Sequence, residues 1–234
     1  MEKKILGIVG GVGPLATMFI GEMIVRRTKA ATDQEHVHSI ITNNTSIPDR
    51  TAYILDRSNE DPIPVMVSDI QKLTSIGAEI IIVPCNTAHT FYNDMQKGST
   101  VPVIHMIRET MKRASEEGAK KVGILATTGT ITSAVYQQAA KEFGLQAVLP
   151  DEETQDKVMS IIYDNVKAGK TADGKTWSEI DSYMKSRSCD RVVLGCTELS
   201  IVKKEMGLAD FYLDSLIVLA ETAITACGYE LAEK

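Results

Sequence analysis

Short apolar runs rich in β-branched residues alternate along the chain with longer amphipathic stretches. Continuous apolar runs are typical of parallel strands whose sheet is covered on both faces. Strands are predicted at residues 5–9, 39–42, 79–83, 101–104, 121–125, 146–149 and 191–194. Helices are predicted at residues 14–29, 62–76, 105–117, 130–143 and 152–167, most of them ending at a glycine. This alternation predicts an α/β fold.

Two sequence patterns occur twice. KKILGIV at residues 3–9 returns as KKVGIL at 120–125, and IIVPCNT at 81–87 returns as VVLGCT at 192–197. The repeat predicts two similar Rossmann-like halves with parallel sheets, related by a pseudo-twofold axis, so that equivalent loops face each other across a cleft. We expect residues 1–103 plus 210–234 in one half and 104–209 in the other, with 168–176 as a mobile connection.

Composition and charge favour a small-molecule partner. The 234 residues carry a formal net charge of −6, and lysine and arginine occur singly or in pairs rather than in longer runs. This argues against nucleic acid or an anionic membrane as the main partner. The first apolar stretch is too short for a signal peptide, and no segment approaches the roughly 20 apolar residues of a membrane span. We therefore expect a cytosolic protein with reduced thiols.

Two of the four cysteines, Cys85 and Cys196, follow predicted buried strands and precede predicted helix starts. Ligands of open α/β sheets bind at the carboxyl ends of strands, where both cysteines fall. Backbone N–H groups and the positive end of a helix dipole stabilise a thiolate, so we expect a lowered pKa at both thiols. Such thiols suit proton transfer near neutral pH.

Three other roles are compatible with one or both of these thiols. A single cysteine at a strand end is more often a small buried hydrophobe, but two repeat-equivalent cysteines reverse that preference. Cys85 and His89 have the spacing of zinc ligands, yet Glu198 alone completes a set around Cys196 poorly. A cysteine hydrolase would use Cys85 and His89 and leave Cys196 unexplained. No metal is therefore predicted.

A two-base proton exchange explains both thiols. Inverting a stereocentre requires one group to remove the α-proton from one face and another to deliver a proton to the opposite face. Two chemically equal groups suit a reaction that runs in both directions. Cys189, which precedes a strand, and Cys227, on the apolar face of the last helix, are predicted to be structural.

Four motifs resemble the aspartate/glutamate racemase family, and within it the aspartate racemases, over essentially the whole chain. They are GGVGPLAT at residues 10–17, SIPDRT at 46–51, PCNTAH at 84–89 and LGCTEL at 194–199. The resemblance implies a cofactor-independent amino-acid racemase built from two α/β halves, with the active site in the cleft between them and one thiol from each. A homodimer is common in this family.

The resemblance also assigns substrate-binding residues. Arg50 matches the family arginine that pairs with the substrate's side-chain carboxylate, and Lys167 matches a lysine on a mobile segment over the site. Val12, where the family commonly has methionine, lines the pocket entrance in relatives. Asn86, Thr87, Thr127, Thr197 and Glu198 complete the expected set as donors or tuning groups. Thr127 serves equally well as an ordinary helix cap.

The sequence is also compatible with other functions. GGVG at residues 10–13 lacks the spacing and the downstream acid of a dinucleotide-binding loop, so no nucleotide cofactor is expected. Within the superfamily, maleate isomerases, hydantoin racemases and arylmalonate decarboxylases use cysteine chemistry in a similar cleft. The PDRT segment at residues 48–51 favours an acidic amino acid instead. A non-catalytic amino-acid-binding module is the alternative from a different class.

Overall fold

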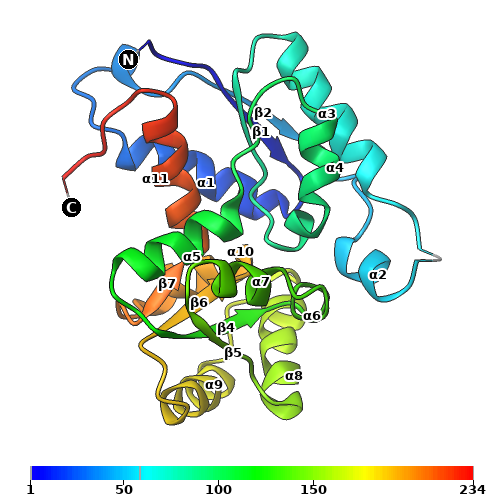
Figure 1. The fold of residues 1–234 in the computed structure, drawn as a ribbon, viewed down its shortest axis with the longest axis vertical. Helices are drawn as coiled ribbons and strands as arrows, with labels where there is room; N and C mark the ends of the chain where they lie inside the picture. The colour runs from blue at the N-terminus through cyan, green and yellow to red at the C-terminus, as the bar shows by residue number, and fades with distance from the viewer. Residues whose placement is uncertain (1, 58, 234) are drawn as a thin grey trace. The chain divides into compact units, whose positions relative to one another are not determined.

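The computed structural model describes residues 2–57 and 59–233, and the chain divides into two compact units (Figure 1). One unit comprises residues 1–106 and 216–234, and the other comprises residues 107–215. The predicted boundary at 209/210 differs from the observed one because an unpredicted strand, β7 (Tyr212–Asp214), pairs with β6 (Arg191–Gly195) and so belongs to the second unit.

The first unit contains a parallel sheet of order β2-β1-β3. Its elements are β1 (Leu6–Gly10), α1 (Pro14–Arg27), the 3-10 turn η1 (Asp33–Glu35), β2 (Ser39–Asn43), α2 (Arg50–Leu55), α3 (Ile63–Ser75), β3 (Ile80–Ile82), the 3-10 helix η2 (Thr87–Phe91), α4 (Tyr92–Lys97) and, from Leu216 onward, α11 (Ser215–Ala226).

The second unit contains a parallel sheet of order β5-β4-β6-β7. Its elements are α5 (Met106–Glu116), β4 (Lys121–Ala126), α6 (Thr128–Thr132), α7 (Val135–Glu142), β5 (Gln146–Val148), α8 (Glu152–Ser160), the π-helix η3 (Ile161–Val166), α9 (Gly174–Ser186), β6, α10 (Thr197–Met206) and β7. The prediction of an α/β fold with parallel sheets is confirmed.

Both sheets follow one strand order. In each, the first strand lies between the second and the third, so β1 corresponds to β4 and β3 corresponds to β6. Val103 forms a single parallel bridge with Ile81 of β3, as β7 pairs with β6. The prediction of a strand at 101–104 is therefore wrong, because only this single bridge forms there. Pro102 has no N–H group, and the N–H of Val103 donates to the Gln96 side chain.

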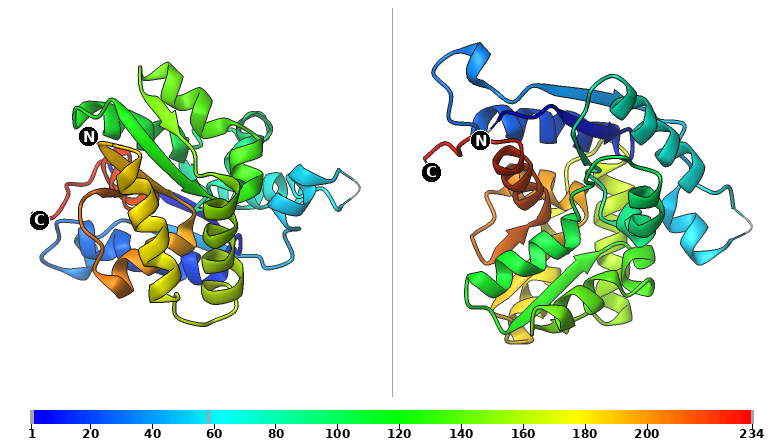
Figure 2. Two further views of the ribbon diagram at one scale, coloured as in Figure 1. Left: turned by 90° about the horizontal axis from the view of Figure 1, so that it is seen from below. Right: turned by 45° about the horizontal axis from the view of Figure 1, so that its top comes forward.

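The central strands of each sheet are covered on both faces, as their continuous apolar runs predict, whereas the edge strand β2 is partly exposed (Figures 1 and 2). In the first unit, Leu6 and Ile8 face α1 and α11, whereas Val9 and Ile81 face α3 and α4. In the second unit, alternate residues of β4 and β6 pack against α8, η3, α9 and α10 on one face and against α5 and α7 on the other. Because the faces of the central strands are apolar, we look for polar functional side chains at the strand ends.

Several helix predictions need correction. The helix predicted at 130–143 is two helices, α6 and α7, separated by Ala134 in the left-handed conformation with φ 57°. The connection predicted at 168–176 is shorter, because Asp173 caps α9 by accepting the N–H of Thr176 at 2.7 Å. No helix in the described part of the chain is long and apolar enough to cross a membrane.

Candidate active site

Cys85 lies in a tight turn just beyond β3, at the carboxyl end of the first sheet. Its N–H donates to the carbonyl of Val83 at 2.8 Å, and η2 begins two residues later. The Cys85 side chain is 7% exposed, and the adjacent Asn86 and Thr87 are also buried. The predicted helix start after this thiol is a 3-10 helix of five residues, whose N-terminal dipole is weaker than that of a longer α-helix.

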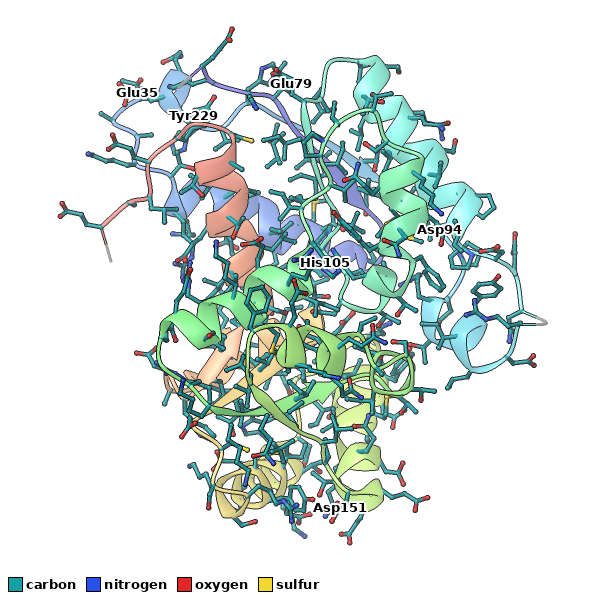
Figure 3. The ribbon with its side chains drawn as sticks, viewed as in Figure 1. Glu35, Glu79, Asp94, His105, Asp151 and Tyr229 are labelled. Carbon is teal, nitrogen blue, oxygen red and sulfur yellow. The ribbon has the colours of Figure 1, made fainter. Side chains whose placement is uncertain are left out.

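His89 holds the Cys85 turn in place. Nδ1 of its buried ring lies 2.9 Å from the carbonyl oxygen of Cys85, and Nε2 accepts the N–H of Met106 at 3.1 Å. Burial lowers the pKa of His89, so the ring is neutral and Nδ1 carries the proton that Cys85 accepts. His105, labelled in Figure 3, packs against Tyr92 with ring centres 4.2 Å apart. Both nitrogens of His89 are thus engaged with backbone rather than available to a metal.

The glycine-rich loop after β1 packs against the chain that follows β2. A Cβ atom on Gly11 would lie 2.2 Å from the carbonyl oxygen of Asn44, and the φ of Gly11 is +89°. Thr17 accepts the N–H of Gly11 and donates to the carbonyl of Gly13, which fixes the loop on α1. Val12 is 2% exposed and belongs to the same apolar cluster as Cys85. The loop is shaped by close backbone packing.

Arg50 is the first residue of α2 and is 8% exposed. Asp49 caps this helix by accepting the N–H of Ala52 at 2.8 Å. One guanidinium nitrogen of Arg50 donates to the carbonyl oxygens of Pro48 at 2.8 Å and Ile47 at 3.3 Å. Ile47 belongs to the cluster that contains Val12 and Cys85. The first unit therefore brings Val12, Cys85 and the loop of Arg50 together.

Cys196 lies between the end of β6 and the first turn of α10, in the position of the second sheet that corresponds to Cys85. Its thiol is 6% exposed and donates a hydrogen bond to Glu198 at 2.8 Å. Thr197 donates to the same carboxylate oxygen at 3.2 Å. Glu198 is itself 6% exposed and lies in the first turn of α10, where the helix dipole favours a carboxylate. The sequence motif CTE thus forms a contiguous hydrogen-bonded unit.

The expectation of a lowered pKa is wrong for Cys196. Burial, followed by the negative charge of Glu198, raises the pKa of this thiol well above its usual value of 9.0. The positive charge of Lys167 acts in the opposite direction and is outweighed. The position of Cys196 at a helix N-terminus did not predict its pKa, because desolvation and the neighbouring carboxylate have larger effects on the thiol. Cys196 is therefore a protonated donor at neutral pH in this state.

Replacing Glu198 by glutamine should make Cys196 more reactive. The change removes a charge that raises the pKa of the thiol, so more thiolate should be present at pH 8. Each unit by which the pKa falls should increase the alkylation rate by about tenfold. Iodoacetamide labelling followed by peptide mass spectrometry measures this rate. Glu205→Gln, an exposed position on the same helix, should leave it unchanged, and an unchanged rate in Glu198→Gln would contradict the assignment.

Polar residues that sequence analysis missed hold both sides of the Cys196 turn. Ser215 donates to the carbonyl of Leu194, two residues before the thiol, at 2.7 Å. Ser200, one turn after it, donates to Asp214 at 2.7 Å. Tyr136 hydrogen-bonds with Ser215, and burial raises its pKa. An Asp and a Ser at the end of a strand were the available signal, but β7 has only three residues and was not predicted.

Lys167 and Thr127 approach the same strand ends. Lys167 is exposed and directly follows η3, with its ammonium group 4.4 Å from the ring centre of Tyr163. Thr127 follows Ala126, which pairs with Gly195. The hydroxyl of Thr127 accepts the N–H of Thr130 at 3.3 Å and caps α6. The second unit thus gathers Lys167, Thr127 and the CTE unit at one edge of its sheet.

Metal binding finds no support in side-chain geometry. Among the residues that the structure describes, no group of three or more His, Cys, Asp or Glu side chains is placed to hold a metal ion. All four cysteines are free thiols. The polar groups at the two strand ends are instead thiols, a carboxylate, hydroxyls and two cationic side chains, which is a set suited to proton transfer and carboxylate binding.

Comparison with known proteins assigns the family. The model of the Asp/Glu/hydantoin racemase family matches residues 9–223. The chain belongs to this family. It is an enzyme, an amino-acid racemase of the isomerase class. The resemblance read from the four sequence motifs is thereby confirmed at the level of the family.

The similarity to individual relatives extends over nearly the whole length of the racemase. A broad specificity amino-acid racemase from Bacillus subtilis (strain 168) is 29% identical over 227 residues, which is 94% of this chain and 96% of the relative. An aspartate racemase structure from Picrophilus torridus is 30% identical, with a TM-score of 0.85 over 98% of this chain and 96% of its own. An aspartate racemase homologue from Pyrococcus horikoshii OT3, 24% identical with a TM-score of 0.77 over 96% and 99%, shows the shared fold.

Proposed function

We propose that this racemase interconverts L- and D-aspartate, with glutamate or a broader set of acidic amino acids as further substrates, by a two-base mechanism without pyridoxal phosphate. The observation that carries the proposal is the equivalence of Cys85 and Cys196. Each follows the third strand of a sheet with the same strand order, each is buried, and each is followed within two residues by a helix start. Two matched thiols suit a reaction whose two directions are chemically equal.

The mechanism assigns the thiols complementary protonation states. In a turnover that starts from this state, Cys196 is the acid, because its thiol is protonated and donates to Glu198. Cys85 then acts as the thiolate that removes the α-proton, while Cys196 delivers a proton to the opposite face of the same carbon. The electron pair left by the broken C–H bond forms the new C–H bond. The two thiols exchange roles for the reverse direction.

Acidification of the α-hydrogen requires stabilisation of negative charge on the substrate carboxylates. The planar fork of Arg50 suits a bidentate contact with the side-chain carboxylate. We assign the α-carboxylate to donors around Asn86, Thr87 and Thr197, and we assign Lys167 to charge stabilisation beside Cys196. Val12, which shares an apolar cluster with Cys85, lines the entrance of the pocket. A cytosolic location and a homodimeric assembly complete the proposal.

A broader substrate range is the second candidate. The near full-length similarity to a broad specificity amino-acid racemase favours it. It keeps the two thiols and changes only the contacts of the substrate side chain. In that case, amino acids without a side-chain carboxylate would be racemised at rates comparable to that of aspartate.

A racemisation assay on both enantiomers of a panel of amino acids distinguishes these candidates. Enzyme treated with hydroxylamine and dialysed, which removes pyridoxal phosphate, is incubated with aspartate, glutamate, alanine and lysine, and the enantiomers are separated by chiral chromatography. We expect aspartate to have the highest kcat/KM and to reach equal amounts of L and D from either side, because enantiomers have equal free energies. Loss of activity after treatment, or no interconversion of any amino acid, would overturn the proposal.

A further inference from the structure

The helix that begins as α8 changes its hydrogen-bond pattern before it reaches Lys167. After Ser160 it continues as the six-residue π-helix η3. The N–H of Lys167 donates to the carbonyl of Ile162, five residues earlier, at 3.0 Å. Such widened turns are rare and often occur at functional sites. Because Lys167 directly follows η3, the widened turn sets the direction in which this lysine leaves the helix.

The π-helix packs against the beginning of the helix that carries the thiol. Ile162 and Val166 of η3 share one apolar cluster with Cys196 and Leu199, and η3 contacts α10. The backbone that carries Lys167 is therefore fixed relative to Cys196 within the second unit. A lysine side chain nevertheless has a flexible stem of four carbons, so a fixed backbone does not fix the position of its ammonium group.

The ring of Tyr163 contacts this ammonium group. The Nζ atom of Lys167 lies 4.4 Å from the centre of this ring, within the distance of a cation–π contact. Tyr163 is half-buried and packs against the cluster that contains Cys196, so the ring is itself held in position. This contact shows that the two side chains, four residues apart, lie on the same side of the widened helix.

We propose that Tyr163 is a positioning residue for the racemase, whose ring holds the ammonium group of Lys167 beside the Cys196 thiol. The charged or titratable groups that interact with this thiol are Glu198 on its own helix, Lys167 after η3 and Tyr136 on α7. Lys167 supplies the positive charge that lowers the pKa of Cys196, and the backbone N–H of Glu198 has a smaller effect in the same direction. Its effect on turnover rests on the proposed function, but its effect on the thiol exists without substrate.

The test compares four variants by iodoacetamide labelling of Cys196 between pH 7 and 9, without substrate. Tyr163→Leu removes the ring, Tyr163→Phe keeps it, Lys167→Gln removes the charge, and the fourth variant combines Tyr163→Leu with Lys167→Gln. We expect Tyr163→Leu to slow labelling by about two- to fivefold, the effect of losing an exposed cation–π contact. Tyr163→Phe should match the wild type, and Lys167→Gln should be slowed at least as much as Tyr163→Leu.

The double variant decides how Tyr163 acts. If Tyr163 works through Lys167, adding Tyr163→Leu to Lys167→Gln should change the labelling rate no further. Additive slowing would overturn the proposal, because the ring would then act through packing alone, and wild-type labelling of Tyr163→Leu would overturn it as well. Thermal unfolding confirms that each variant is folded. The labelling result is independent of whether aspartate is racemised, so failure of the proposed substrate is seen separately in the racemisation assay.

Discussion

Replacing either Cys85 or Cys196 by serine should stop inversion of aspartate, with kcat lowered by about 10²- to 10⁴-fold, the usual contribution of one acid/base group. A serine hydroxyl is far less acidic than a thiol, so it neither holds a negative charge nor releases a proton at neutral pH. Chiral chromatography measures the loss. The binding of aspartate, followed by calorimetry, should be kept, since neither thiol is assigned to carboxylate binding.

Each single variant should still exchange the α-hydrogen of one enantiomer with solvent. The remaining thiol can remove the proton and return one to the same face, and the two variants should act on opposite enantiomers. Cys189→Ser is the matched control, because this thiol is half-buried at the other end of the second sheet, before β6. Undiminished racemisation by Cys85→Ser or Cys196→Ser would contradict the assignment of that thiol.

Replacing Arg50 by glutamine should lower kcat/KM for aspartate by about 10²- to 10³-fold, because a buried charged partner of the substrate carboxylate is lost. Arg50→Lys should lose about tenfold, since it keeps the charge but not the planar fork. Steady-state kinetics with aspartate and alanine separate the contributions. Alanine has no side-chain carboxylate, so its racemisation should be affected far less.

Arg57→Gln provides the matched control for Arg50. This arginine is exposed, follows α2 and lies over the ring of Tyr53 with 4.5 Å to its centre. Its replacement should leave both substrates unaffected. Equal losses for aspartate and alanine in Arg50→Gln would show that Arg50 acts through the loop carbonyls of Ile47 and Pro48 rather than through the substrate.

The fold was largely predictable because its strands are continuous apolar runs that alternate with amphipathic helices. The repeated patterns around Gly7 and Gly123, and around the two cysteines, also predicted two similar α/β halves, although the order of the strands became visible only in the structure. The position of each thiol at a strand end followed from local sequence alone. These features depend on hydrophobic periodicity and on turn residues, both of which can be read without knowledge of tertiary contacts.

What the sequence did not predict depends on tertiary environment. The pKa of Cys196 is raised by burial and by Glu198, and neither the depth of burial nor the hydrogen bond is visible in a motif. The strand β7 is too short to give a periodic signal, so the contact between Asp214 and Ser200 was missed. The π-helical turn before Lys167 has no sequence signature of its own, and an unbroken helix was predicted there.

The origin of the proton delivered to the product tests the two-thiol account most directly. L-Aspartate with protium at the α-carbon is converted in D₂O, and the first few per cent of D-aspartate formed are analysed by mass spectrometry. Because one thiol removes the proton and the other delivers one equilibrated with solvent, we predict that this product carries deuterium while the remaining L-aspartate is unlabelled. Early D-aspartate that retains protium would show that one group carries the same proton between faces, which would contradict the account.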